Sequence, residues 1–197
     1  AVLGLSLVVL TGWSGLVSLG QMGFFALGAA VGAKATSDWG LDLTLALLVS
    51  ALAGAAVAVV IGLPALRRRG LELAVITLAF ALASTSYFLN HRFFDWVPDQ
   101  SQRIARPALF GRIDIDTPTR FYAYTLAVLA IVILLVRGIR RSRTGRVIVA
   151  MRENERAAQS FSVAPVRAKL TAFMLSGAVA GVAGGLFVHM NHAFSLS

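Results

Sequence analysis

The sequence predicts an all-α protein that crosses a membrane several times, and three observations lead to this prediction. Hydrophobic residues make up 57% of the 197 residues, charged residues only 14%, and the mean hydropathy is +0.77. Soluble domains contain about 45–50% apolar and about 25% charged residues, so a soluble fold of this composition would leave apolar surface in water. The apolar residues also form runs of about 20, the length that an α-helix needs to cross a bilayer. We therefore predict a polytopic transmembrane helical bundle, a single domain over residues 1–197.

The first three apolar runs differ in length and in how they end. Residues 1–11 are too short to cross a bilayer and are typical of the end of a truncated span. Residues 16–35 form a full span that ends at a polar Thr-Ser-Asp turn. Residues 41–66 form a second full span, closed by the arginine triplet at 67–69. The chain opens in mid-run without an initiating Met and stops soon after another run, so we expect a fragment of a longer chain, cut at both ends.

Three further runs follow, separated by two long polar segments. Residues 71–89 form a span that leads into the polar stretch 90–120, and residues 121–136 form a shorter span. A basic loop occupies residues 137–169, and residues 170–190 form the last span. All these runs are continuously apolar and lack the alternation of membrane barrel strands, so we predict helices throughout.

The positions of Lys and Arg give the orientation of the chain in the membrane. Twelve of the 18 basic residues lie in two segments, 67–69 and 137–169. Two predicted spans separate these segments, so both lie on one side of the membrane. Cytoplasmic loops carry the excess of Lys and Arg, which assigns 137–169 to the cytoplasm and 90–120 to the extracytoplasmic side.

The basic character of the chain indicates a lipid bilayer and no nucleic acid as a partner. A formal net charge of +9 and a pI near 11.4 would suggest nucleic-acid binding in a soluble protein. Such binding needs a basic patch on a soluble surface, whereas here the charge lies in loops between apolar runs. The absence of cysteine excludes disulfides and thiolate metal sites.

Small residues recur at four-residue spacing within the spans, which indicates close helix packing. Gly177, Gly181 and Gly185 form the longest series, and Gly28 and Gly32 form a second one. Small residues let helix backbones approach closely in lipid. We favour packing within one subunit over a dedicated dimer face.

The basic loop is too long for a simple connector, and it contains a helical pattern. Apolar residues recur at helical spacing over residues 146–161, which predicts a short amphipathic helix on the cytoplasmic face. Arg152 with Glu155, and Glu153 with Arg156, are spaced to pair on the helix surface. A surface helix held by anionic lipid is one interpretation. The two Glu residues and Asn154 favour a protein partner.

Three stretches of this chain carry a distinctive pattern: residues 142–155 (SRTGRVIVAMRENE) with 169–173 (KLTAF), residues 15–21 (GLVSLGQ) and residues 62–67 (GLPALR). They resemble, in that order, the cytoplasmic loop with its following span, the early glycine-rich span and the central arginine turn of one family. That family is the LivM-type permease subunits of branched-chain amino acid ABC importers. Together with their flanking residues, these stretches cover most of the chain.

The resemblance implies a multi-pass subunit of the bacterial inner membrane that has no catalytic residue, cofactor or metal of its own. The implied partners are separate ATPase subunits, a second permease subunit and an extracytoplasmic substrate-binding protein. ATP would bind to the ATPase, because this chain has no phosphate-binding loop. The implied substrates are branched-chain amino acids or related small amino acids and amides. The role of coupling helix, which docks into the ATPase, is carried over to Gly145, Arg146, Arg152, Glu153, Asn154, Glu155 and Ala158.

Polar residues within the predicted spans are candidates for the translocation path. Buried polar groups in spans face a cavity or a neighbouring helix, so they either line a path or form interhelical hydrogen bonds. Both interpretations stay open for Ser18, Gln21, Thr77, Ser84 and Thr85.

Two other classes of membrane protein compete with the importer. Gly12-Trp-Ser-Gly15 matches a motif of rhomboid-type intramembrane proteases, in which Ser14 and His189 would form a serine–histidine dyad. A channel or secondary transporter would carry an ionisable residue in mid-membrane, whereas Lys34 and Glu72 fall near span ends. His189 and His192 lack a nearby carboxylate or cysteine, so we predict no metal site there.

Overall fold

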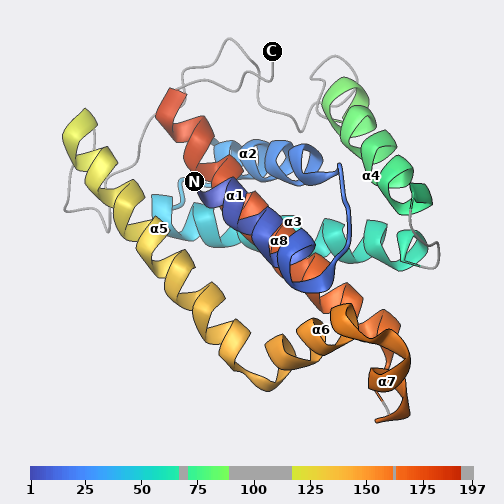
Figure 1. The fold of residues 1–197 in the computed structure, drawn as a ribbon. Helices are drawn as coiled ribbons and strands as arrows, with labels where there is room; N and C mark the ends of the chain where they lie inside the picture. The colour runs from blue at the N-terminus through green and yellow to red at the C-terminus, as the bar shows by residue number, and fades with distance from the viewer. Residues whose placement is uncertain (67–70, 89–116, 162, 192–197) are drawn as a thin grey trace.

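The computed structural model describes residues 1–66, 71–88, 117–161 and 163–191, and every regular element in these ranges is a helix (Figure 1). The predicted all-α fold is therefore confirmed for these residues. Among them, three helices are long and apolar enough to cross a membrane: α3 (Leu43–Ala65), α5 (Pro118–Arg141) and α8 (Pro165–Asn191). The others are α1 (Val2–Leu7), the π-helix η1 (Val8–Trp13), α2 (Gln21–Ser37), α4 (Leu71–Ala83), the π-helix η2 (Ser84–Phe88), α6 (Arg143–Glu153) and α7 (Glu155–Ser160).

Helix α8 lies at the centre of the bundle and packs against both α2 and α3 (Figure 1). A Cβ atom on Gly181 would overlap the backbone carbonyl of Ser50 in α3, and one on Gly184 would overlap the carbonyl of Phe25 in α2. Gly28 of α2 likewise faces the backbone of Gly181. The small-residue series therefore packs helices within one subunit, as the sequence predicts.

The predicted span 16–35 begins as an irregular, non-helical segment and becomes helical only at Gln21. Gly15 has a φ of +67°, a conformation that L side chains rarely adopt, so the chain turns sharply after η1. In the segment that follows, two backbone amides donate hydrogen bonds to side chains. The Leu19 amide donates to Thr77 Oγ1 at 3.1 Å, and the Gly20 amide donates to Ser18 Oγ at 3.2 Å. Hydrophobicity alone does not distinguish such a segment from a helix.

The two long predicted loops are shorter than expected, because helices extend into them. Helix α5 begins at Pro118, inside the predicted 90–120 segment, and ends at Arg141, inside the basic loop. Helix α8 begins at Pro165, which suits the first turn of a helix because its missing N–H needs no partner there. Most of segment 90–120, the arginine triplet at 67–69, Ser162 and His192 lie outside the described residues.

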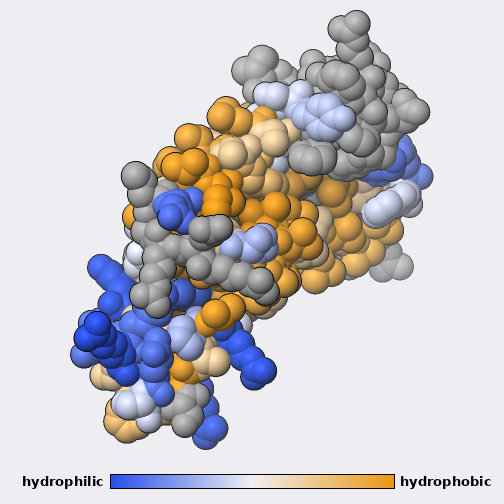
Figure 2. All heavy atoms as spheres, turned by 90° about the vertical axis from the view of Figure 1, so that its right-hand side faces the viewer, coloured by the Kyte–Doolittle hydropathy of each residue, from blue (hydrophilic) through white to orange (hydrophobic). Residues whose placement is uncertain are grey.

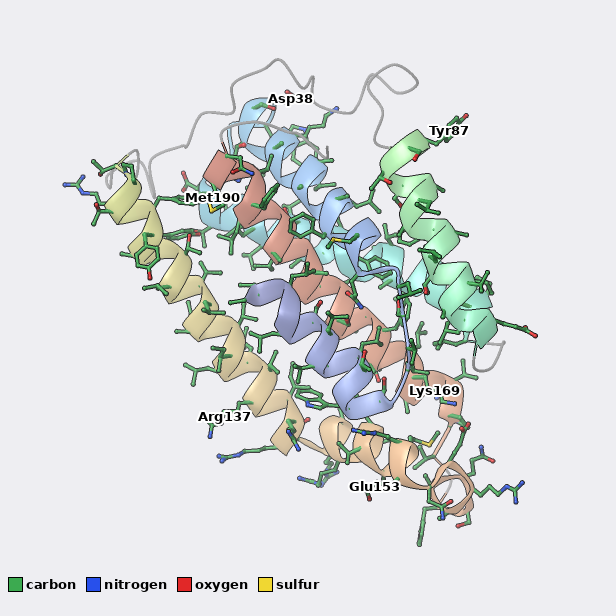
Figure 3. The ribbon with its side chains drawn as sticks, turned by 45° about the horizontal axis from the view of Figure 1, so that its top comes forward. Asp38, Tyr87, Arg137, Glu153, Lys169 and Met190 are labelled. Atoms are coloured by element: carbon green, nitrogen blue, oxygen red, sulfur yellow. The ribbon has the colours of Figure 1, made fainter. Side chains whose placement is uncertain are left out.

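The bundle has one strongly basic end, which carries α6, α7 and the ends of α5 and α8. Figure 3 places Arg137, Glu153 and Lys169 at this basic end and Asp38, Tyr87 and Met190 at the opposite one. Leu66 at the end of α3 packs with Leu170 of α8, so α3 also ends at the basic end. This agrees with the predicted orientation. Figure 2 shows an apolar band across the middle of the visible face and hydrophilic residues gathered over α6 and α7.

We predict that Gly181→Ala destabilises the bundle by about 1–3 kcal/mol, because its Cβ would push α8 away from the Ser50 carbonyl. The matched control is Gly138→Ala in α5, where a Cβ meets no atom within 4 Å. The control should stabilise the helix by about 0.5–1 kcal/mol, the ordinary gain of alanine over glycine. Both free energies of unfolding are measurable by denaturant titration in detergent micelles, and equal stability of the two variants would contradict the packing.

Candidate functional site: the coupling segment

The first candidate site is the pair of helices α6 and α7 at the basic end, which we call the coupling segment (residues 143–160). Helix α6 starts where the Ser142 hydroxyl accepts a hydrogen bond from the Gly145 amide at 3.4 Å, a common N-terminal cap. A Cβ on Gly145 would overlap the backbone of Ile139 and Arg140. Gly145 therefore lets α6 fold back tightly against the end of α5.

The coupling segment consists of two helices, and the prediction of one continuous helix over residues 146–161 is wrong. The helix breaks at Asn154, which has an extended backbone with φ −151° and ψ 95°. Its side-chain oxygen accepts a hydrogen bond from the Ala157 amide at 3.0 Å, so Asn154 ends α6 and caps α7. The break separates the predicted pairs Arg152–Glu155 and Glu153–Arg156, neither of which forms in the described part of the chain.

Arg152 connects the coupling segment to the first helix of the bundle. Its guanidinium donates a hydrogen bond to the backbone carbonyl of Gly12, near the end of η1. The last carbonyls of a helix lack partners within the helix, and a cation satisfies them well. The aliphatic part of Arg152 also covers Gly15, where an added Cβ would lie 3.1 Å from Arg152 Cγ. Arg152 thus lies over the turn that follows η1 and stays exposed to solvent.

Glu155 and Ala158 connect α7 to the start of α8. Both carboxylate oxygens of Glu155 accept hydrogen bonds from Lys169 Nζ at 2.9 Å, and the pair is partly shielded from solvent. Ala158 is buried beside Met151 and Ala168 in a small apolar cluster. The coupling segment is therefore attached both to η1 and to the membrane-length helix α8.

The outer face of the coupling segment is exposed and carries charge beside apolar surface. Arg146 and Glu153 are exposed, and neither they nor Arg156 forms an ion pair within the described ranges. A hollow of about 400 Å³ lies on this face, between α6 and the end of α7. Phe161 lines the hollow and is 83% exposed. The sequence pattern places Phe161 on the apolar face of a single helix, and the break at Asn154 is what exposes it.

Gln21 lies in a buried hydrogen-bonded network that joins α1, α2 and α8. Its Nε2 donates to Ser176 Oγ at 2.9 Å, and its Oε1 accepts from Ser6 Oγ at 3.2 Å. Ser176 Oγ in turn lies 2.8 Å from the backbone carbonyl of Ser6. Ser6 and Ser176 are not among the predicted path residues, although they complete this network. Of the two interpretations left open for Gln21, the structure shows the interhelical hydrogen bond.

The other predicted path residues divide into two groups. Ser18 and Thr77 lie close to Gln21. Their hydroxyl groups accept hydrogen bonds from the amides of Gly20 and Leu19, respectively, and so hold the irregular segment 16–20 in place. Thr85 bonds within its own helix, to the Ala81 carbonyl at 3.1 Å. Ser84 is buried, and its hydroxyl has no partner among the described residues. The structure thus brings Ser18, Gln21 and Thr77 together at the start of α2, with Ser84 and Thr85 further along α4 and η2.

Ser14 and His189 do not form a dyad. The Ser14 hydroxyl donates to the Leu10 carbonyl, and the His189 ring contacts Thr36 Oγ1 at 3.1 Å and the Gly185 carbonyl at 2.6 Å. His189 lies near the far end of α8, 13 residues or about 20 Å beyond Ser176 in the middle of that helix. Ser14 lies in the other direction, near the basic end. The protease interpretation is therefore excluded by geometry.

Comparison with known proteins identifies the family. The model of the family described as "Branched-chain amino acid transport system / permease component" matches residues 1–197. The chain belongs to this permease family. It is 35% identical to the "High-affinity branched-chain amino acid transport system permease protein LivM" of Salmonella typhimurium strain LT2, with 94% of this chain and 49% of the relative covered. It is 36% identical, with the same coverage, to the protein of that name in Escherichia coli K12.

The chain spans about half the length of these two curated relatives. No solved structure matches it. Membership of the family agrees with the resemblance seen in the sequence, and it accounts for a multi-pass membrane protein with a helical core.

We predict that Arg152→Ala loosens both α6 and η1, because it removes the hydrogen bond between them. Amide hydrogen exchange in these two helices should become roughly fivefold faster, as expected for about 1 kcal/mol of lost local stability. The matched control is Arg156→Ala, since Arg156 is exposed and contacts neither η1 nor α8 by an ion pair in the described chain. If exchange in η1 is unchanged in Arg152→Ala, the connection between the two helices is wrong.

Proposed function

We propose that this chain is the membrane-spanning permease part of an ATP-driven importer and that its coupling segment docks onto a separate ATPase. One observation carries the proposal. The coupling segment is exposed on one face and is attached to two elements of the bundle, through Arg152 to η1 and through Glu155 to the membrane-length helix α8. A segment built in this way is suited to receive movement from outside the membrane and to pass it into the bundle.

The residues of the coupling segment have two different roles in this proposal. Arg146 and Glu153, together with Phe161 beside the hollow, face outward and contact the ATPase. Phe161 would fill an apolar depression on the ATPase, and the two charges would fix the register. Gly145, Arg152, Asn154, Glu155 and Ala158 shape the segment and hold it to the bundle.

We further propose that the substrate is a branched-chain amino acid or a related small amino acid or amide. The names of the two relatives support this substrate class. The irregular segment before α2 marks a section of the path, because irregular backbone at membrane depth is tolerated only where protein or a cavity surrounds it. Ser18 within this segment, Gln21 directly after it and Thr77 beside it would contact polar groups of the substrate or hold the segment that does.

The proposed assembly contains this permease, a second permease subunit, two ATPase subunits and an extracytoplasmic binding protein. Transport driven by an external ATPase agrees with the positions of Lys34 and Glu72, which lie near helix ends and not in the middle of a span. Lys34 pairs with Asp38 near the end of α2 opposite the basic end, and Glu72 lies in the first turn of α4. Family membership and this placement both favour an ATP-driven importer over the channel, secondary-transporter and protease alternatives.

We predict that Glu153→Arg abolishes ATPase association and substrate uptake while membrane insertion stays normal. The reason is that charge reversal on the outer face leaves the contacts of Arg152 and Glu155 with the bundle intact. Co-purification of the ATPase and uptake of labelled leucine measure the two effects. The matched control is Asp38→Arg, which reverses an exposed charge at the opposite end and should leave ATPase co-purification unchanged. Normal uptake by Glu153→Arg would overturn the coupling assignment.

A further inference from the structure

An apolar groove runs along the inner side of α5, apart from the coupling segment and the polar residues near Gln21. It lies between α5, α3, α8 and η1 and has a volume of about 300 Å³. Tyr124 and Thr44 close it at one end, where their hydroxyl groups lie 3.4 Å apart. Trp13 and Ile139 line it at the basic end. Exposed side chains of Leu48, Ile131 and Leu135 stand among its lining residues.

The length of the groove fits a flexible hydrocarbon chain. From Tyr124 to Ile139 the groove follows about 22 Å of α5, at the rise of an α-helix. One leaflet of hydrocarbon is about 15 Å deep, half the bilayer core, so the groove is long enough for a lipid acyl chain.

The basic end of the groove carries uncompensated positive charge. The Arg140 guanidinium carbon lies 5.9 Å from the centre of the Trp13 ring, which places Arg140 at the mouth of the groove. Residues 137–152 contain six arginines and no acidic residue. Trp13 itself is buried at this end of the groove, so Arg140 places a positive charge where an anionic headgroup on a groove-bound lipid would find a partner.

We propose that this groove binds one anionic glycerophospholipid of the cytoplasmic leaflet. One acyl chain lies in the groove along α5, and the phosphate group contacts Arg140 beside Trp13. Basic pockets between transmembrane helices on the cytoplasmic side are suited to acidic headgroups. A bound lipid would also fill the space beside α5, which is largely exposed in the described structure.

The site can be tested in the complete protein, reconstituted into vesicles in a background that retains Trp13 as its single tryptophan. The probes are phosphatidylglycerol and phosphatidylcholine with brominated acyl chains, which quench tryptophan fluorescence on close approach. Each probe is added in turn to vesicles of unlabelled phosphatidylcholine. We expect brominated phosphatidylglycerol to quench Trp13 with about fivefold higher apparent affinity, the preference that one arginine near an anionic surface provides.

Two variants separate the headgroup contact from the acyl-chain contact. Arg140→Gln should abolish the preference for phosphatidylglycerol, with both lipids quenching equally. Ala178→Phe fills the groove from α8 and should reduce quenching by both lipids. The matched control is Arg137→Gln, because Arg137 lies on the side of α5 away from the bundle and its loss should preserve the preference (Figure 3).

Three results would overturn the proposal. Equal quenching by the two lipids in the unmodified protein would show that the headgroup is not recognised. No quenching by either lipid would show that a protein segment or a second copy of the chain occupies the groove. Loss of the preference in Arg137→Gln but not in Arg140→Gln would place the anionic lipid on the outer side of α5.

Discussion

Direct backbone contact between α8 and its two neighbours is the constraint on which the rest of this structure depends. Gly181 and Gly184 allow the backbones of α3 and α2 to approach α8 more closely than any side chain would permit. In lipid this contact is important, because packing rather than hydrophobic burial holds membrane helices together. The contact fixes the position of α8 and of two residues on it. Ser176 accepts a hydrogen bond from Gln21, and Lys169 pairs with Glu155 of the coupling segment.

The coupling segment acquires its proposed role from two attachments that reach different parts of the bundle. Arg152 holds the end of η1, and Glu155 holds the start of α8. The irregular segment 16–20 follows η1 and leads into α2, and hydrogen bonds to Thr77 and Ser18 keep it in place. Movement of the coupling segment would therefore reach the irregular backbone that we propose as part of the substrate path. The proposed lipid lies on the other side of η1, beside α5, and stabilises the helix that leads into the coupling segment.

The sequence predicted the helical class, the three membrane-length helices α3, α5 and α8 and the close packing of glycines, because length, hydropathy and residue size determine these features directly. The predicted spans 16–35 and 71–89 are shorter helices in the structure, α2 from Gln21 and α4 followed by η2. The sequence did not predict that residues 16–20 are non-helical, since an apolar segment has the same composition whether its N–H groups bond to helix carbonyls or to Thr77. It also predicted one helix where Asn154 makes two, because a capping asparagine and a surface asparagine look alike in a helical pattern. Arg152 was predicted to pair with Glu155 on the helix surface, whereas its observed partner, the Gly12 carbonyl, is 140 residues away in sequence.

The central claim is that the coupling segment and η1 move as one unit, and a pair of distance measurements tests it directly. This chain has no cysteine, so spin labels can be placed on Thr144→Cys in α6, Thr11→Cys in η1 and Leu52→Cys in α3. In the complete transporter, addition of ATP should leave the α6–η1 distance unchanged, because Arg152 joins these two helices, and the α6–α3 distance unchanged, because Glu155 joins the segment to α8, which packs directly on α3. A change in the α6–η1 distance on addition of ATP would contradict the account.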